Sequence, residues 1–152
     1  MKKIEDILAE HPFFAGLSTD FAKFLAGCAK HVRFEAGQFL FQDGEAADQL
    51  YLIQRGKVAL QIHGPDRALT FQTLGKGELV GVSWLIPPYR WNYDAKALET
   101  TLTLSLDATC LRDKCDKDHD LGYEMMQRFV PVLIERLHAT RMQLLDLYDH
   151  GE

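Results

Sequence analysis

The chain has 152 residues, of which 47% are hydrophobic and 26% are charged, and its formal net charge at pH 7 is −5. These values are typical of one soluble globular domain and exclude a disordered chain. The acidic balance, with no dense run of Lys or Arg, provides no electrostatic surface for nucleic acid. No apolar stretch approaches the roughly 20 residues of a membrane-spanning helix, and the N-terminus lacks an apolar signal-peptide core. We therefore expect a cytoplasmic protein.

Residues 1–30 show helical spacing. Ile4, Ile7 and Leu8 predict a short amphipathic helix that Pro12 ends. Ser18 is a candidate N-cap for a second helix, whose apolar residues continue as far as Cys28.

Residues 31–107 change to short apolar runs separated by turn signals at intervals of eight to twelve residues or so, which is typical of a β-sandwich or barrel. We interpret Gly37, Gly44 and Gly56 as corner residues with a purely structural role. Residues 70–74 and 96–106 predict further strands. The fold class expected is mainly β with α: an antiparallel β-roll, jelly-roll-like, flanked by N-terminal helices and a long C-terminal helix.

Residues 108–150 return to a helical period. A short helix is predicted over 108–116 and a long one over 121–148, with Pro131 as a kink or a restart. One face of the long helix carries apolar residues at alternating steps of three and four, an a/d pattern that predicts pairing with another helix. Met125, Met126 and Phe129 are expected to pack on the chain's own β-roll instead. The residues of this dimer seam are Val130, Leu133, Leu137, Thr140, Leu144 and Leu147.

Three cysteines, Cys28, Cys110 and Cys115, are an odd number and do not indicate a disulfide framework. A metal site would need His119 beside Cys110 and Cys115, which is sparser than known metal motifs. We interpret the thiols as small buried hydrophobes and expect no metal.

Two segments resemble the cyclic nucleotide-binding domain family. HPFFAGLS over 11–18 resembles its helical entry, and FEAGQFLFQDGEAADQLYLIQRGKV over 34–58 resembles its first strands and turns. The resemblance covers nearly the whole chain and is strongest to the sensor half of bacterial catabolite-activator-type (Crp/Fnr) regulators. It implies a single domain over 1–152 with a regulatory, ligand-sensing function.

In the family, a Gly-Glu-Leu turn opens a short helix whose amides bind the cyclic phosphate, and an Arg-Ser/Thr pair completes the site. Gly77, Glu78 and Leu79 resemble the first half, followed by Val80. The positions expected to hold this pair are occupied by Trp91-Asn92 in one alignment and by Tyr93-Asp94 in another. Arg90 is the arginine next to them. The phosphate-binding cassette is thus predicted to be degenerate. The candidate ligand-binding residues are Gly77, Glu78, Leu79, Val80, Arg90, Trp91, Asn92, Tyr93 and Asp94.

Three interpretations of this stretch stay open. It binds an atypical small anionic ligand, it binds cAMP or cGMP through Arg90, or its own side chains fill it. In the third case the side chains of Trp91 and Tyr93 fill the core, and Arg90 forms an ion pair with Asp94 or Glu78. The protein is then a ligand-free dimerisation or protein-interaction domain. No motif supports Ser-His-Asp or Cys-His catalysis, so we do not expect an enzyme.

The resemblance also implies a homodimer through the C-terminal helix, which would lie over the ligand pocket and transmit the signal. Regulators of this family continue into a helix-turn-helix domain that contacts DNA. No second basic recognition helix follows the seam in this sequence, so direct nucleic-acid binding is not expected.

Overall fold

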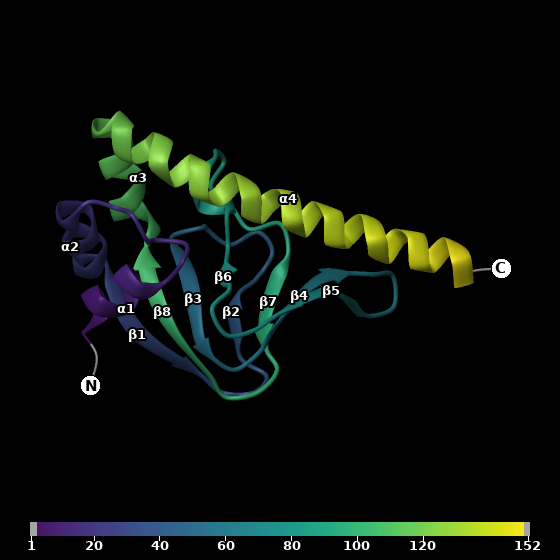
Figure 1. The fold of residues 1–152 in the computed structure, drawn as a ribbon. Coiled ribbons are helices and arrows are strands. Elements are labelled where there is room, and N and C mark those ends of the chain that lie inside the picture. Colours follow the sequence, from purple (N-terminus) through teal and green to yellow (C-terminus); the bar gives the residue numbers. More distant parts are fainter. Residues whose placement is uncertain (1–2, 151–152) are drawn as a thin grey trace.

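The computed structural model describes residues 3–150, which begin with two short helices (Figure 1). These are α1 (Ile4–Glu10) and α2 (Thr19–Gly27), and both were predicted. Helix α1 ends just before the His11-Pro12 dipeptide because a residue that precedes proline disfavours helical backbone angles. The Phe21 N–H donates a hydrogen bond to the Ser18 hydroxyl at 3.2 Å, which confirms Ser18 as the N-cap of α2.

Within residues 3–150, eight strands form two antiparallel four-stranded sheets, which confirms the predicted β-roll. One sheet has the strand order β1–β8–β3–β6 and the other has the order β2–β7–β4–β5. The strands are β1 (Ala29–Phe34), β2 (Phe39–Phe41), β3 (Gln49–Arg55), β4 (Val58–His63), β5 (Ala68–Leu74), β6 (Leu79–Val80), β7 (Asp94–Ala97) and β8 (Thr101–Asp107).

The strand predicted over 96–106 is in fact two strands in different sheets. Strand β7 pairs with β2 and β4, whereas β8 pairs with β1 and β3. The chain crosses between the sheets at residues 98–100, where Leu98 is 48% exposed. The alternation of apolar residues continues through the crossing, which is why the sequence pattern did not reveal the break.

The three corner glycines adopt the backbone conformation that their interpretation requires. Gly37, Gly44 and Gly56 have φ angles of 92°, 89° and 110°, a region that side-chain-bearing residues rarely adopt. At Gly56 space is a second constraint, because a Cβ atom there would lie 2.5 Å from Oγ1 of Thr101 and 2.7 Å from its Cα. The β3–β4 turn is therefore pressed against the first residue of β8.

The last part of the chain forms α3 (Ala108–Lys117) and the 32-residue α4 (His119–His150). Helix α4 crosses the two sheets at one end and continues past the tip of the β4–β5 hairpin (Figure 1). The restart predicted at Pro131 does not occur. Pro131 is exposed, so water can reach the carbonyl group that loses its helical partner. No helix within residues 3–150 is both long enough and apolar enough to cross a membrane.

The hydrophobic core lies between the sheets and extends under the first half of α4. Met125 is fully buried and Phe129 is 2% exposed, as predicted, but Met126 is 41% exposed and does not pack on the roll. Met126 follows Met125 directly, and a step of one residue turns the side chain about 100° around a helix. Among the described side chains of α4, the buried ones are Leu121, Met125 and Phe129.

Candidate functional site

The turn at Gly77–Leu79 does not open a helix, contrary to the expectation from the family resemblance. The Gly77 N–H donates to the Ile53 carbonyl at 2.8 Å, the Glu78 N–H donates to the Gly75 carbonyl at 3.1 Å, and Leu79 starts strand β6. The turn is thus a connection between β5 and β6. Leu79 and Val80 are buried core residues, whereas Glu78 is exposed.

A short helix does follow, but it starts later. The 3₁₀ helix η1 (Ser83–Leu85) comes after Gly81, whose φ is 107°. Sequence reasoning placed the start of the helix at the wrong glycine because only Gly77 is followed by Glu-Leu. The residues at the actual helix start are Val82 and Ser83, and the sequence signal that marks them is the second glycine, Gly81.

The indole of Trp91 fills the space beside Gly81. Trp91 is 3% exposed, and its ring stacks on Phe41 with centroids 3.7 Å apart and an angle of 8° between the planes. A Cβ atom on Gly81 would overlap the six-membered ring of Trp91. Trp91 is therefore a core residue in direct contact with the backbone that precedes η1.

Tyr93 continues the aromatic cluster. Its ring makes edge contacts with Phe41, at 5.5 Å between centroids, and with Phe71 at 5.7 Å. Burial raises the pKa of the Tyr93 hydroxyl, an effect that the nearby Arg136 partly opposes. Asn92, between the two aromatic residues, is exposed. Of the residues from 91 to 94, only Asn92 is exposed, and β7 starts at Asp94.

Neither predicted ion pair of Arg90 forms. Arg90 is exposed, and its Nη1 donates to the carbonyl oxygen of Gly44 at 2.9 Å. Asp94, 2% exposed, instead accepts a hydrogen bond from the Asp43 N–H at 2.7 Å and lies 3.1 Å from Nε2 of His63. The backbone of Arg90 forms a β-bridge with Ala46, so that both its backbone and its guanidinium contact the loop before β3.

A cavity of about 630 Å³ lies on the α4 side of the β5–β6 turn. The turn, strand β5, helix α4 and the segment between α1 and α2 all contribute to its wall. Of the nine predicted ligand-binding residues, only Gly77, Glu78 and Leu79 line this cavity. The remaining lining residues are His11, Pro12, Phe13, Gln72, Val132, Glu135, Arg136 and Ala139.

Glu135 and Arg136 are charged residues of this cavity that were not among the predicted ligand-binding residues, and Arg136 is the more buried of the two. One of its terminal nitrogens, Nη2, donates to the Leu79 carbonyl, while the other, Nη1, is buried without a hydrogen-bond partner among the described residues. Burial lowers the pKa of the guanidinium, and the charges of Tyr93, Glu78 and Glu135 oppose that effect. No local sequence signal identifies Arg136, because it lies 57 residues from Leu79 and between two seam residues.

The imidazole of His11 also lines the cavity. Its Nε2 lies 2.7 Å from the carbonyl oxygen of Gly77, and its Nδ1 accepts a hydrogen bond from the Phe13 N–H at 3.0 Å. With Nδ1 as an acceptor, Nε2 carries the proton and donates to Gly77. This arrangement ties the N-terminal segment to the β5–β6 turn.

The sulfur atoms of Cys28 and Cys110 lie 2.8 Å apart, a proximity that their separation of 82 residues did not suggest. Cys28 caps the end of α2, and Cys110 is in the first turn of α3. Desolvation, together with the neighbouring Cys110, raises the pKa of Cys28 to about 12. Among residues 3–150 no group of three or more His, Cys, Asp or Glu side chains is arranged to hold a metal ion.

Comparison with known proteins matches residues 31–118 to the cyclic nucleotide-binding domain family. The chain belongs to this family. It is 26% identical over 145 residues to a CRP-like cAMP-activated global transcriptional regulator of Mycobacterium tuberculosis, and 25% identical over 138 residues to an anaerobic regulatory protein of Bacillus subtilis. These matches include 95% and 90% of this chain but span only 63% and 56% of the two regulators.

Solved structures confirm the fold. A Geobacter metallireducens protein, provisionally named for cyclic nucleotide binding, superposes with a TM-score of 0.80 at 26% identity over 91% of this chain and all of that one. The N-terminal domain of a transcriptional regulator from Streptomyces coelicolor superposes with a TM-score of 0.67 at 26% identity, over 88% of this chain and 94% of the other. The chain is thus a sensor-type domain similar to those of CRP-like regulators.

Proposed function

We propose that this domain is a non-enzymatic sensor of a small anionic ligand and that it transmits ligand binding through α4. The observation that carries the proposal is the cavity that the β5–β6 turn shares with α4, with the guanidinium of Arg136 in its wall. A ligand in this cavity would contact the helix and the roll at once. It would therefore favour one position of α4 over others, which is the physical requirement for a ligand to shift a conformational equilibrium.

The phosphate-binding cassette, in this proposal, no longer performs its usual task. Trp91 occupies the space against Gly81, and Arg90 is bonded to Gly44 on the outside of the roll. Both contacts oppose the binding of a cyclic phosphate over the start of η1. The name of the M. tuberculosis relative says that it is activated by cAMP, so cAMP and cGMP remain necessary members of any ligand panel.

We further propose that the domain forms a homodimer along α4. Five of the six predicted seam residues are apolar and between 42% and 70% exposed, and the sixth, Thr140, is exposed as well. A helix with so continuous an exposed apolar stripe gains free energy when a second copy covers it. Ligand binding under α4 would then alter the geometry between the two copies. The seam residues with these exposures are Val130, Leu133, Leu137, Leu144 and Leu147.

A second candidate function is a ligand-free dimerisation or protein-interaction domain, and the packing of Trp91 against Gly81 and Phe41 favours it. In that case α4 would serve only as an interface. The cavity beside Arg136 would then have no physiological occupant.

Thermal unfolding in the presence of ligands separates the two candidates. The panel contains cAMP, cGMP, cyclic dinucleotides and small organic acids, each titrated from micromolar to millimolar concentration. A sensor is expected to show saturable stabilisation by one class of ligand, because a ligand that binds only the folded state raises the unfolding temperature. If no anion in the panel raises the unfolding temperature, the sensor proposal fails and the ligand-free domain is favoured.

A further inference from the structure

Two thiols that are far apart in the sequence meet where α2 approaches α3. The Sγ atoms of Cys28 and Cys110 lie 2.8 Å apart, and both residues are free cysteines. A disulfide bond joins two sulfur atoms at roughly 2.0 Å, so the pair needs a further approach of less than about 1 Å to form one. The fold thus presents the two sulfur atoms to each other before any bond exists between them.

Backbone hydrogen bonds hold both cysteines in this position. Cys28 directly precedes β1, and its carbonyl accepts a hydrogen bond from the Asp107 N–H at 2.8 Å, which extends the β1–β8 pairing by one step. Asp107 is also the N-cap of α3, and its carboxylate accepts a hydrogen bond from the Cys110 N–H at 3.1 Å. Asp107 therefore bonds to the backbone of both cysteines. Reacting groups that are held in contact in this way need little further ordering to react.

A small oxidant can reach this pair of thiols from solvent. Neither Cys28 nor Cys110 is fully buried, and Gly27 and Thr109, which precede them in the chain, are exposed. The third thiol is in a different place. Cys115 lies beside Gly122 at the junction of α3 and α4, and within the described chain it is in hydrogen-bonding contact with neither of the other two sulfurs. Cys115 is therefore an internal control for the pair.

We propose that Cys28 and Cys110 form a reversible disulfide bond, which makes their contact a redox-controlled modification site that links α2 to α3. The oxidant is a low-molecular-weight disulfide such as oxidised glutathione. The inference goes beyond the proposed sensor function and does not depend on it, because the bond requires neither a ligand nor a second copy of the chain.

The bond forms by two successive thiol–disulfide exchanges. Burial is the main cause that raises the pKa of Cys28 to about 12, so Cys28 stays protonated at neutral pH and Cys110 provides the first thiolate. The Cys110 sulfur attacks one sulfur of oxidised glutathione, whose S–S bond breaks and releases a glutathione thiolate. The Cys28 sulfur then attacks Sγ of Cys110, the bond to glutathione breaks, and the second glutathione leaves with the proton of Cys28. The two cysteines lose two electrons, and one glutathione disulfide becomes two glutathione molecules.

The new bond would add a covalent anchor to α3, the element that connects the roll to α4. Arg112 of α3 donates hydrogen bonds to the carbonyls of Ala47 and Trp84, so this helix is already attached to the loop before β3 and to η1. The disulfide would attach it to α2 as well. Because the two cysteines are 82 residues apart, the bond also removes much of the conformational freedom of the unfolded chain. Oxidation should therefore stabilise the fold.

The experiment equilibrates wild-type protein in mixtures of reduced and oxidised glutathione and traps the remaining thiols with N-ethylmaleimide. Peptide mass spectrometry without reduction then maps the disulfides. We expect a linked peptide pair that contains Cys28 and Cys110, with Cys115 alkylated, and we expect dithiothreitol to remove the link. The oxidised protein should unfold roughly 5–15 °C above the reduced protein. The mapping uses wild-type protein, so it does not depend on the folding of any variant.

Matched variants assign the effect to the pair. Cys28→Ser and Cys110→Ser should each abolish the difference in unfolding temperature between oxidised and reduced protein, whereas Cys115→Ser should keep it. Cys28→Ala and Cys110→Ala replace any serine variant that fails to fold. Non-reducing electrophoresis of the oxidised wild type should show a single-chain band, because the two sulfurs belong to one chain.

The outcomes are distinct. A bond between Cys28 and Cys110 that forms in the folded wild type, opens in dithiothreitol and raises the unfolding temperature supports the inference. Three results overturn it: no linked peptide at any glutathione ratio, a link that forms only in urea, or a link through Cys115 in the folded protein. A link that leaves the unfolding temperature unchanged overturns the anchoring of α3. None of these results bears on the sensor function, because no ligand enters the measurement.

Discussion

Trp91 lies directly against the backbone of Gly81, so that no side chain can be added at position 81 without displacing the indole. The contact joins the segment before β7 to the residues that precede η1. Protein atoms therefore fill the interior of the roll beside Gly81, so that substitutions at this position should change the stability of the fold.

Gly81→Ala should destabilise the fold by about 2–4 kcal/mol, from the strain of a positive φ and from overlap with Trp91. The matched control is Gly37→Ala, where φ is 92° and no atom lies within 4 Å of an added Cβ, so that only the backbone strain of about 1–2 kcal/mol applies. Urea unfolding of both variants gives the difference. Equal losses at the two positions would show that Trp91 yields freely.

Asp94→Asn should lower the free energy of unfolding by about 1–3 kcal/mol, because the buried carboxylate accepts from the Asp43 N–H and contacts His63. His63→Gln should cost less than about 1 kcal/mol, since the His63 side chain is 65% exposed. Asp66→Asn, at an exposed position of the β4–β5 turn, serves as the control and should change little. A loss as small for Asp94→Asn as for Asp66→Asn would contradict the structural role of Asp94.

Stability should fall as the pH rises above about 9, with a contribution from Cys28. In the unfolded chain this thiol loses its proton near its ordinary pKa of 9.0, whereas the fold raises the pKa to about 12. Between these values the unfolded state binds fewer protons, so deprotonation favours unfolding. Unfolding measurements at pH 8, 9, 10 and 11 should show a shallower decline for Cys28→Ala than for wild type. A decline that is the same in both proteins would contradict the prediction.

Alkylation offers an independent test of the same thiol. At pH 8 Cys28 should react with iodoacetamide more than about tenfold slower than in the unfolded chain, because the thiolate is the reactive form. Cys115, whose pKa is raised by burial to about 11, should also be protected. Peptide mass spectrometry after timed labelling measures each site. Rapid labelling of Cys28 in the folded protein would refute the assigned pKa.

Leu137→Asp should convert the proposed homodimer into a monomer, since it places a charge in the middle of the apolar seam. Leu137 is 50% exposed, and Leu98, which is 48% exposed on the connection between β7 and β8, provides the control Leu98→Asp. Light scattering on wild type and both variants gives the masses. A wild-type monomer, or a dimer that persists in Leu137→Asp, would contradict the proposal that the seam is an interface.

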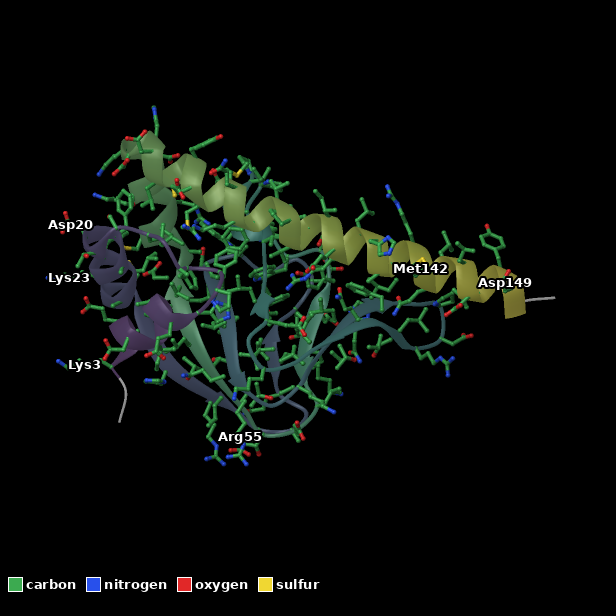
Figure 2. All side chains as sticks on the ribbon, viewed as in Figure 1. Lys3, Asp20, Lys23, Arg55, Met142 and Asp149 are labelled. Carbon is green, nitrogen blue, oxygen red and sulfur yellow. The ribbon has the colours of Figure 1, made fainter. Side chains whose placement is uncertain are left out.

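The seam continues into the C-terminal part of α4, which is marked by Met142 and Asp149 and extends past the β4–β5 hairpin (Figure 2).

Local sequence patterns were sufficient for most of the fold. Ser18 marked the start of α2, and the corner glycines Gly37, Gly44 and Gly56 marked the turns of the roll, because each signal depends on backbone conformation within a few residues. The break between β7 and β8 was not predictable, because the alternation of apolar residues is the same whichever sheet a strand joins. The restart predicted at Pro131 was wrong because the cost of a proline inside a helix depends on whether water can reach the neighbouring backbone.

The site was less accessible to sequence reasoning than the fold. The sequence marked the segment 90–94 as a departure from the family pattern. Whether its side chains point toward a ligand or into the core depends on packing against Phe41, Phe71 and Gly81. No sequence pattern linked His63 to Asp94, yet the two side chains are in contact across the β4–β7 pair. Arg136 carried no motif at all.

The sequence by itself determined the β-roll, its corners and the helices at both ends, since these follow from hydrophobic periodicity and from glycines that must adopt positive φ. Only the tertiary structure decided what surrounds the cavity. The docking of α4 brings Arg136 to the Leu79 carbonyl, and the return of the chain into β7 places Trp91 on Gly81. Contacts between residues so far apart in the chain depend on how whole elements pack, and no local pattern of residues encodes that packing.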